Sequence, residues 1–286
     1  MPSLIDIRRR IRSVKNTQQI TKAMKMVSAA KLRRAQDRVI ASRPYAAMLR
    51  KMLENVAAAV ATDEQAGRNP LLAQRAEQRI LLVLITLDKG LAGAFNANLI
   101  KGAQKFMAEH GGASVRLELI GRKGRDFFRK RQADIAGEHL GLAAKVVYGD
   151  LAAIARKAMD LYSQDEIDAV YLLYNGFKSV VAQQLTITRV LPVELRERAE
   201  RVDYIFELAP AKILDALLPR YVELEFFRAM LESAAAEHAA RMTAMEAATS
   251  NAGEMIDKLT LYMNRVRQAS ITKEIIEVVS GAASAE

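Results

Sequence analysis

The stretch Arg241–Ser270, RMTAMEAATSNAGEMIDKLTLYMNRVRQAS, predicts a long helix that pairs with another helix. Its apolar side chains recur at heptad spacing, which is the pattern of a coiled coil. Thr249 and Ser270 interrupt this seam, whose apolar members are Met242, Met245, Ala252, Ile256, Leu259, Met263 and Val266. Good helix formers continue on both sides of the stretch, and no proline follows Pro219. We therefore expect one helix over residues 220–280 that starts just after Pro219.

A helix of this length does not fit inside a compact globule. At about 1.5 Å per residue, residues 220–280 would span roughly 90 Å, whereas a compact chain of this size has a radius of gyration of roughly 19 Å. Two amphipathic helices folded onto a central domain are the alternative, and the length argues against it. We expect the amino-terminal segment to cover the seam as a second long helix, from Ser3 to about Ala61, running antiparallel to the first.

The amino-terminal segment carries its own seam, but part of that seam is polar. Ser3 and Asp6 have the spacing of a capping box, which marks a helix start. The heptad positions are then apolar (Leu4, Ile7, Ile11, Val14), polar (Gln18, Thr21, Lys25, Ser28) and apolar again (Leu32, Ala35, Val39). A neighbouring stripe is apolar where the seam is polar (Ile20, Ala23, Met24, Val27, Ala30). We expect the apolar face to shift onto this stripe, with Pro44 as a kink.

Between the two ends, the sequence predicts a small α/β domain. Residues 80–87 (ILLVLITL) form a continuous apolar run, which is typical of a buried parallel strand. Further strands are expected at 115–120, 169–174 and 180–190, with helices at 96–110, after 121 and at 149–163. Asn175-Gly176 indicates a turn before an antiparallel last strand. The expected divisions are a helix at 1–61, a linker at 62–76, the α/β domain at 77–195, a linker at 196–219 and a helix at 220–286.

The composition excludes several kinds of chemistry. The chain has no cysteine and only three histidines, so thiolate catalysis is excluded and a histidine-based metal site is not expected. No apolar run is long enough for a membrane span, and the first residues lack a signal-peptide core. The loop Lys89–Gly93 follows a strand but lacks both common phosphate-binding motifs, so a tight connection is favoured over nucleotide binding. We expect no cofactor, no metal and no catalytic residue.

The net charge of +10 is concentrated at the amino terminus. Residues 1–40 contain eleven Lys or Arg against Asp6 and Asp37, a net charge of +9. A basic helix face of this kind indicates a nucleic-acid-binding surface, a contact to an acidic protein or a solvated face. The sequence pattern alone leaves these three alternatives open.

Three stretches resemble the γ subunits of F-type ATP synthases. They are residues 7–36 (IRRRIRSVKNTQQITKAMKMVSAAKLRRAQ), 88–99 (DKGLAGAFNANL) and 241–283 (RMTAMEAATSNAGEMIDKLTLYMNRVRQASITKEIIEVVSGAA). The resemblance implies a non-catalytic rotor in which an antiparallel coiled coil threads a hexamer of α and β subunits. The implied partners also include the ε subunit and the membrane c ring, with a single copy of this chain per complex and no nucleic acid. Because no targeting extension precedes Ser3, we expect a bacterial form on the cytoplasmic face of the inner membrane, held there only through the c ring.

The same resemblance assigns candidate contact residues to this sequence. Those implied to bind loops of the β subunits are Arg267, Gln268 and Thr272, together with Met24, Lys25, Lys31 and Arg241. The implied bearing tip consists of Ile275, Ile276, Val278 and Val279, and the implied foot on the c ring and ε subunit contains Tyr204 and Glu207. The residues themselves leave two other functions open. One is a nucleic-acid-associated protein that uses residues 8–38, and the other is an enzyme that uses the loop at 89–93.

Overall fold

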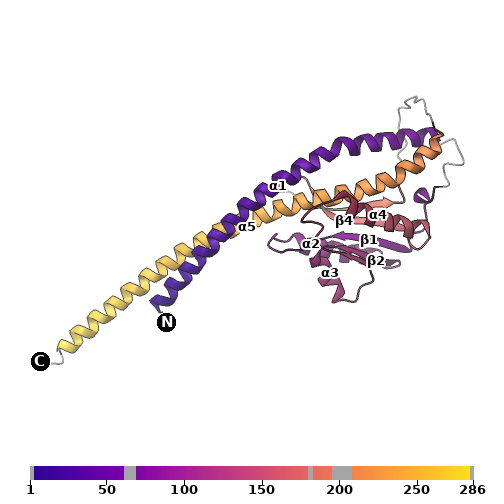
Figure 1. Cartoon of the computed structure of the whole chain (residues 1–286). Coiled ribbons are helices and arrows are strands. Elements are labelled where there is room, and N and C mark those ends of the chain that lie inside the picture. Colours follow the sequence, from indigo (N-terminus) through magenta and orange to yellow (C-terminus); the bar gives the residue numbers. More distant parts are fainter. Residues whose placement is uncertain (1–2, 61–68, 180–182, 195–207, 284–286) are drawn as a thin grey trace. The chain divides into compact units, whose positions relative to one another are not determined.

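The structure, a computed structural model, describes residues 3–60, 69–179, 183–194 and 208–283. The chain divides into two compact units, Met1–Ala29 with Arg241–Glu286, and Ala30–Ala240. We call the first the coiled-coil unit and the second the sheet unit. Two long helices, α1 (Leu4–Val60) and α5 (Pro210–Ala283), each contribute residues to both units (Figure 1). Long terminal helices beside a mixed sheet are the fold class that the sequence predicts.

Helix α1 begins at the predicted capping box. The backbone N–H of Asp6 donates to Ser3 Oγ at 3.2 Å, and the Asp6 carboxylate accepts from the hydroxyl and the backbone N–H of Ser3 at 2.8 and 3.3 Å. The hydrogen bond from the Ser3 side chain also lowers the pKa of Asp6. Because these bonds satisfy N–H groups that a helix start leaves without partners, they favour the helix at Leu4.

Helix α5 joins two helices that the sequence predicts as separate, a brief one at 210–218 and the long one from 220. The expected break at Pro219 is wrong, since the helix is continuous from Pro210 through Pro219. A proline inside a helix removes one backbone hydrogen bond and normally kinks or ends the helix. Here Leu218 and Val222, on either side of Pro219, are fully buried in the sheet unit. Tertiary packing therefore stabilises the helix where local preference would end it.

The sheet unit contains five strands in the order β3-β2-β1-β4-β5. They are β1 (Arg79–Ile85), β2 (Ser114–Ile120), β3 (Ile135–His139), β4 (Ala169–Phe177) and β5 (Gln183–Leu191). The first four are parallel, and β5 pairs with β4 in the antiparallel direction. This confirms the predicted parallel sheet with an antiparallel edge, although β3 was not predicted.

The predicted turn at Asn175-Gly176 is wrong. Both residues lie inside β4, where Asn175 is paired with Leu185 and Gly176 with Gln184. A Cβ atom on Gly176 would lie 2.8 Å from the Thr186 hydroxyl. The glycine therefore permits a close approach between strands rather than a change of direction.

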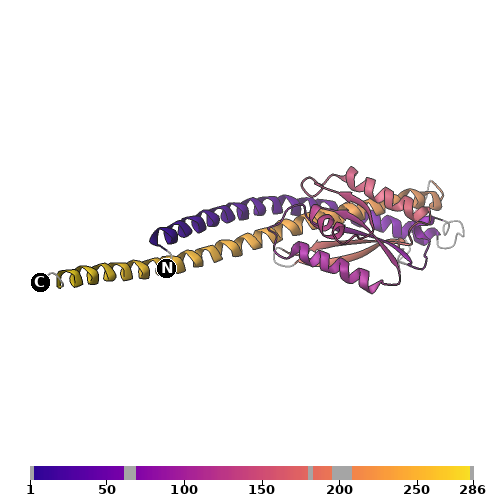
Figure 2. The ribbon, with the colours of Figure 1, turned by 90° about the horizontal axis from the view of Figure 1, so that it is seen from below.

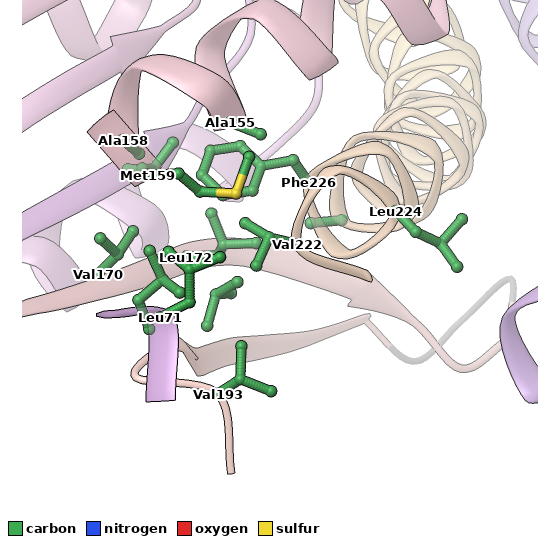
Figure 3. Close-up of a cluster of buried hydrophobic side chains, with 14 of the residues drawn as sticks. Leu71, Ala155, Ala158, Met159, Val170, Leu172, Val193, Val222, Leu224 and Phe226 are labelled. Carbon is green, nitrogen blue, oxygen red and sulfur yellow. The ribbon is translucent and has the colours of Figure 1, made fainter. Parts of the chain in front are cut away.

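Helices cover both faces of the sheet. Helices α2 (Phe95–Glu109) and α3 (Arg122–Arg129) pack with the apolar side chains of one face. Helix α4 (Tyr148–Ser163), with the sheet-unit parts of α1 and α5, packs on the other (Figure 2). Figure 3 shows this second core, in which Ala155 and Met159 of α4 lie near Phe226 of α5 and above Leu172 of β4. A short 3₁₀ helix, η2 (Pro70–Leu72), contributes Leu71 to the same core.

Two buried carboxylates connect elements within the sheet unit. Glu118 of β2 accepts from His139 of β3 at 2.7 Å and from Lys157 of α4 at 3.1 Å. Burial alone would raise the pKa of Glu118, but hydrogen bonds from His139 and Lys157 lower it. Glu223 of α5 accepts from Tyr148 and Arg156 of α4, each at 2.6 Å. Because burial and the neighbouring carboxylate disfavour the phenolate, the pKa of Tyr148 is raised to about 12.

Candidate partner-binding surface

The seam of the coiled-coil unit follows the predicted heptad positions. All nine predicted positions of α5, from Met242 to Ser270, are buried or half-buried, and Met245 and Ala252 are the most enclosed. The seam of α1 in this unit likewise keeps its predicted positions, from Leu4 to Ser28. Lys25 contacts Glu246 and Thr21 contacts Thr249, so the two helices run antiparallel, as predicted.

The expected shift of the apolar face is wrong. Ile20 is 60% exposed and Val27 is 56% exposed, so these side chains point away from α5. The polar residues Thr21 and Ser28 lie in the seam instead, where both are buried. The physical reason is that hydrogen bonds across the seam replace the missing apolar contacts, so α1 keeps one heptad register throughout the unit.

The polar layer is built around Thr249. The hydroxyls of Thr21 and Thr249 lie 2.7 Å apart, and Gln18 Nε2 donates to the backbone carbonyl of Thr249 at 3.4 Å. A Cβ atom on Gly253 would lie 3.2 Å from Gln18 Nε2, so the missing side chain leaves room for the amide. A polar groove of about 640 Å³ opens beside this layer, and Lys22, Lys25 and Glu246 are among its lining residues.

Lys25 has a partner within the chain. Its Nζ lies 2.6 Å from Glu246 Oε1 across the seam, and its side chain is 38% exposed. Exposed ion pairs of this kind contribute little to stability and exchange partners readily. The neighbouring Met24 is half-buried. Because this pair is weak, Lys25 can exchange Glu246 for a carboxylate of a partner protein, and Lys22, one turn earlier on α1, is exposed.

The other predicted basic contacts differ in their surroundings. Lys31 is exposed on the part of α1 that belongs to the sheet unit, and Arg241 is half-buried at the start of the coiled-coil part of α5. Both residues stay predicted partner contacts. Tyr204 and Glu207, the predicted foot, lie outside the described residues.

Arg267, Gln268 and Thr272 are all exposed on the carboxy-terminal part of α5. Gln268 and Thr272 are one turn apart, so they lie on the same side of the helix. The Thr272 hydroxyl donates to the Gln268 carbonyl at 2.9 Å, which leaves its oxygen able to accept from an incoming donor. The three side chains can thus offer a guanidinium, an amide and a hydroxyl to one partner.

The last turns of α5 are exposed without interruption, and half of their side chains are apolar. Every residue of 271–280 is exposed, and Ile275, Ile276, Val278 and Val279 are each at least 57% exposed. Ile271 is also 48% exposed. An apolar helix end of this kind is costly in water unless a partner covers it.

The described parts of the chain show neither a metal-ligand cluster nor a membrane-spanning helix. Among the described residues, no group of three or more His, Cys, Asp or Glu is placed to hold a metal ion. None of the helices described is both long and apolar enough to span a lipid bilayer.

Known proteins resemble this chain along its whole length. A family model described as ATP synthase matches residues 3–285. A protein of Solibacter usitatus named ATP synthase gamma chain is 76% identical over 286 residues, covering 100% of both chains. The chain belongs to the ATP synthase gamma chain family. A gamma chain from Anaeromyxobacter sp. is 50% identical and covers 99% of each chain.

Solved structures agree with this family in their fold. A chain in the central stalk and c-ring structure of Tetrahymena thermophila mitochondrial ATP synthase matches with a TM-score of 0.61 and 27% identity, covering 80% of this chain and 99% of that one. A chain from the Euglena gracilis enzyme in rotational state 3 matches with a TM-score of 0.69 and 19% identity, covering 98% and 94%. The second match concerns the fold alone.

One apolar surface of this gamma chain was not predicted from its sequence. Ile20 and Val27 lie on the outward side of α1, and Met26 beside them is 62% exposed. The sequence does contain a pattern that indicates this surface, because apolar residues lie beside seam positions that are polar. An outward apolar stripe next to basic side chains is a second candidate surface for partner proteins.

Proposed function

We propose that this gamma chain is the rotor of the central stalk in a bacterial F1Fo ATP synthase. In this proposal the coiled-coil unit turns inside a hexamer of α and β subunits, and the chain performs no chemistry itself. Proton flow turns the c ring, and the turning shaft drives the catalytic β subunits through their states in sequence. One copy of the chain serves each complex.

The exposed apolar end of α5 is the observation that carries this proposal. An isolated soluble protein gains nothing from ten successive exposed positions that include Ile275, Ile276, Val278 and Val279. A ring of apolar side chains from the hexamer would cover this tip from every side. Because apolar contact is non-directional, such a bearing resists rotation weakly while it keeps the shaft centred.

The polar residues just before the tip fit the transmission of force. Arg267, Gln268 and Thr272 can form charge-assisted or neutral hydrogen bonds to loops of the β subunits. A few such bonds couple the partners and can still be broken in each step. The coiled-coil groove with Lys22 and Lys25 would meet an acidic segment of β. Met24, Lys31 and Arg241 stay predicted contacts of the same kind.

Contacts at the opposite end of the rotor are proposed on the resemblance alone. The foot with Tyr204 and Glu207 would contact the c ring and the ε subunit. The chain would then lie on the cytoplasmic face of the bacterial inner membrane and associate with it only through the c ring. Nucleic-acid binding by residues 8–38 was the alternative, and the family favours a protein partner for these basic side chains.

Reconstitution with the α and β subunits of the same source tests the proposal. Multisite ATP hydrolysis should appear only when this chain is present, in a complex that holds one copy of it. Arg267→Ala, Gln268→Ala and Thr272→Ala should each lower hydrolysis, and Asp257→Ala, at an exposed position on the same helix outside the groove and the tip, is the matched control. Failure to form a complex, with salt-sensitive binding to DNA or RNA instead, would contradict it.

A further inference from the structure

The coiled-coil groove contains two cations and one carboxylate. Lys22 and Lys25 of α1 are among its lining residues, and Glu246 of α5 is the only carboxylate among the described residues that line it. Glu246 Oε1 lies 2.6 Å from Lys25 Nζ, so a carboxylate of the chain itself occupies one of the two cations. Two lysines against one glutamate leave the groove with a charge of +1, where it would carry +2 without Glu246.

Holding the two helices together is not a sufficient reason for this ion pair. The side chains of Lys25 and Glu246 are 38% and 59% exposed, and ion pairs with this much exposure add little to stability. The seam beside them is closed by other contacts, since Met245 is buried and the hydroxyls of Thr21 and Thr249 lie 2.7 Å apart. Glu246 can therefore leave Lys25 without opening the coiled coil.

An incoming carboxylate would compete with Glu246 for the same nitrogen atom. The Lys25 ammonium is a compact charge on a flexible stem, and an exposed partner on it exchanges readily. Two carboxylates on one ammonium repel each other, so the entry of one favours the departure of the other. Glu246 also lowers the positive potential around the exposed Lys22. Both effects weaken the attraction of this groove for acidic groups of a partner.

We propose that Glu246 is an internal competitor that limits how tightly the coiled-coil groove holds a carboxylate of the β subunit. In the chain alone Glu246 holds Lys25, and in the complex a β carboxylate displaces it. The return of Glu246 to Lys25 offsets part of the cost of separating the β carboxylate, so the contact can form and break as the shaft turns. This inference rests on the proposed function, in which the groove meets an acidic segment of β.

Competition between chains for a limiting amount of α and β subunits tests the proposal. An equimolar mixture of isotope-labelled unaltered chain and Glu246→Gln is assembled with these subunits, and mass spectrometry of the purified complex gives the ratio of the two chains. Glu246→Gln should be enriched about threefold, because no carboxylate of the chain competes for Lys25 any longer. The ratio should fall toward one at high salt, where exposed charges are screened.

Two further variants separate competition from other effects of the substitution. Most of the enrichment should disappear when both competing chains also carry Lys25→Met, since the contested cation is then absent. Glu254→Gln makes the same chemical change at an exposed position of α5 outside the groove, and it should enter the complex as readily as the unaltered chain. Glu246→Gln should not raise the midpoint of chemical unfolding of the chain alone, because it removes an ion pair and adds no contact.

A carbodiimide, which joins a lysine amine to a carboxylate in contact with it, identifies the occupant of Lys25. It should link Lys25 to Glu246 in the chain alone and to a peptide of β in the complex. Depletion of Glu246→Gln would show that Glu246 binds a partner cation, and it would overturn the proposal. Equal incorporation, undiminished enrichment in the Lys25→Met background, or a link to Glu246 that persists in the complex would overturn it too. If the unaltered chain enters no complex, the proposed function itself is wrong, and this inference fails with it.

Discussion

Thr21 of α1 and Thr249 of α5 face each other across the coiled-coil seam, with their hydroxyl oxygens 2.7 Å apart. Each hydroxyl also lies within hydrogen-bonding distance of a backbone carbonyl of its own helix, at Gln18 and Met245 respectively. If one threonine is replaced, the hydroxyl of the remaining threonine can therefore still donate to the backbone carbonyl of its own helix. This arrangement allows the seam to be polar without leaving a buried hydroxyl unsatisfied.

The threonine pair should show a small and non-additive effect on stability. Thr21→Val or Thr249→Val alone should lower the free energy of unfolding by about 1 kcal/mol, because one cross-seam hydrogen bond is lost. The double variant should be near neutral, since two apolar groups of the same shape replace both partners. Chemical denaturation of all four chains in a double-mutant cycle measures this. Thr17→Val is the control, because exposed Thr17 makes only a local bond to Ser13. Additive losses in the cycle would contradict the prediction.

The end of α5 should exchange its amide hydrogens rapidly in the free chain. Every side chain of 271–280 is exposed, so tertiary packing adds little to the helical hydrogen bonds there. Hydrogen exchange followed by mass spectrometry should show fast exchange in this segment and slow exchange near the buried Ala235 and Ala239. In the assembled complex the segment should become protected. Equal protection of both segments in the free chain would sink this prediction.

Glu118 should be more sensitive to substitution than a less buried carboxylate of the same sheet. Its side chain is 2% exposed and accepts hydrogen bonds from His139 and Lys157. Glu118→Gln should lower the free energy of unfolding by about 2 kcal/mol, because two cationic or donor groups lose their charged partner. Glu138→Gln is the control, since Glu138 of β3 is paired with the more exposed Arg129 at the end of α3, and its loss should cost less than about 1 kcal/mol. A similar loss in both variants, measured by denaturant unfolding, would argue against a special role for Glu118.

Asp168 should contribute to the loss of stability in acid. Its carboxylate accepts from the side chain of Arg79 at 2.7 Å and from the backbone N–H groups of Gln78 and Arg79. The hydrogen bond from the Arg79 side chain is the main cause that lowers the pKa of Asp168, against an opposing effect of burial. The folded pKa is below the unfolded value of about 3.9. This contribution is therefore complete above about pH 4 and disappears as the pH falls through the folded pKa.

The corresponding measurement compares unfolding of the unaltered chain and of Asp168→Asn from pH 7 down to pH 2. The variant should be less stable at pH 7, and its stability should decline less steeply below pH 4. Parallel declines in the two chains would show that Asp168 does not contribute to the acid transition. Asp150→Asn, at an exposed position in the first turn of α4, serves as the control.

The heptad positions of both helices could be predicted because burial in a two-helix seam depends on spacing alone. From Met242 to Ser270, heptad spacing correctly predicted which side chains are buried or half-buried, and this held for the polar Thr249 and Ser270 as well. The direction of Ile20 and Val27 could not be predicted in the same way. Hydropathy favours placing them inside, and only the hydrogen bond between Thr21 and Thr249 explains why polar residues take the seam. Such a bond depends on the register of two segments that are far apart in the sequence.

In the sheet, too, features that depend on contacts between distant segments could not be predicted from the sequence. The apolar runs at β1 and β4 predicted buried strands, whereas Ile135–His139 (IAGEH) has little strand preference. This segment forms an edge strand because Gly137 leaves room for the Glu118 side chain, to which a Cβ atom would approach within 2.2 Å. Asn175-Gly176 has the local signature of a turn, and its pairing with β5 overrides that signature.

Rotation of this chain inside its complex tests the central claim most directly. Because the chain has no cysteine, a single Cys introduced at exposed Lys101 of α2 can carry a biotin and a bead without side reactions. The complex with α and β subunits is fixed to a surface through the β subunits and supplied with ATP. The account predicts stepwise rotation of the bead in one direction, which stops when ATP is removed. Steady ATP hydrolysis by an intact complex whose bead does not turn would contradict it.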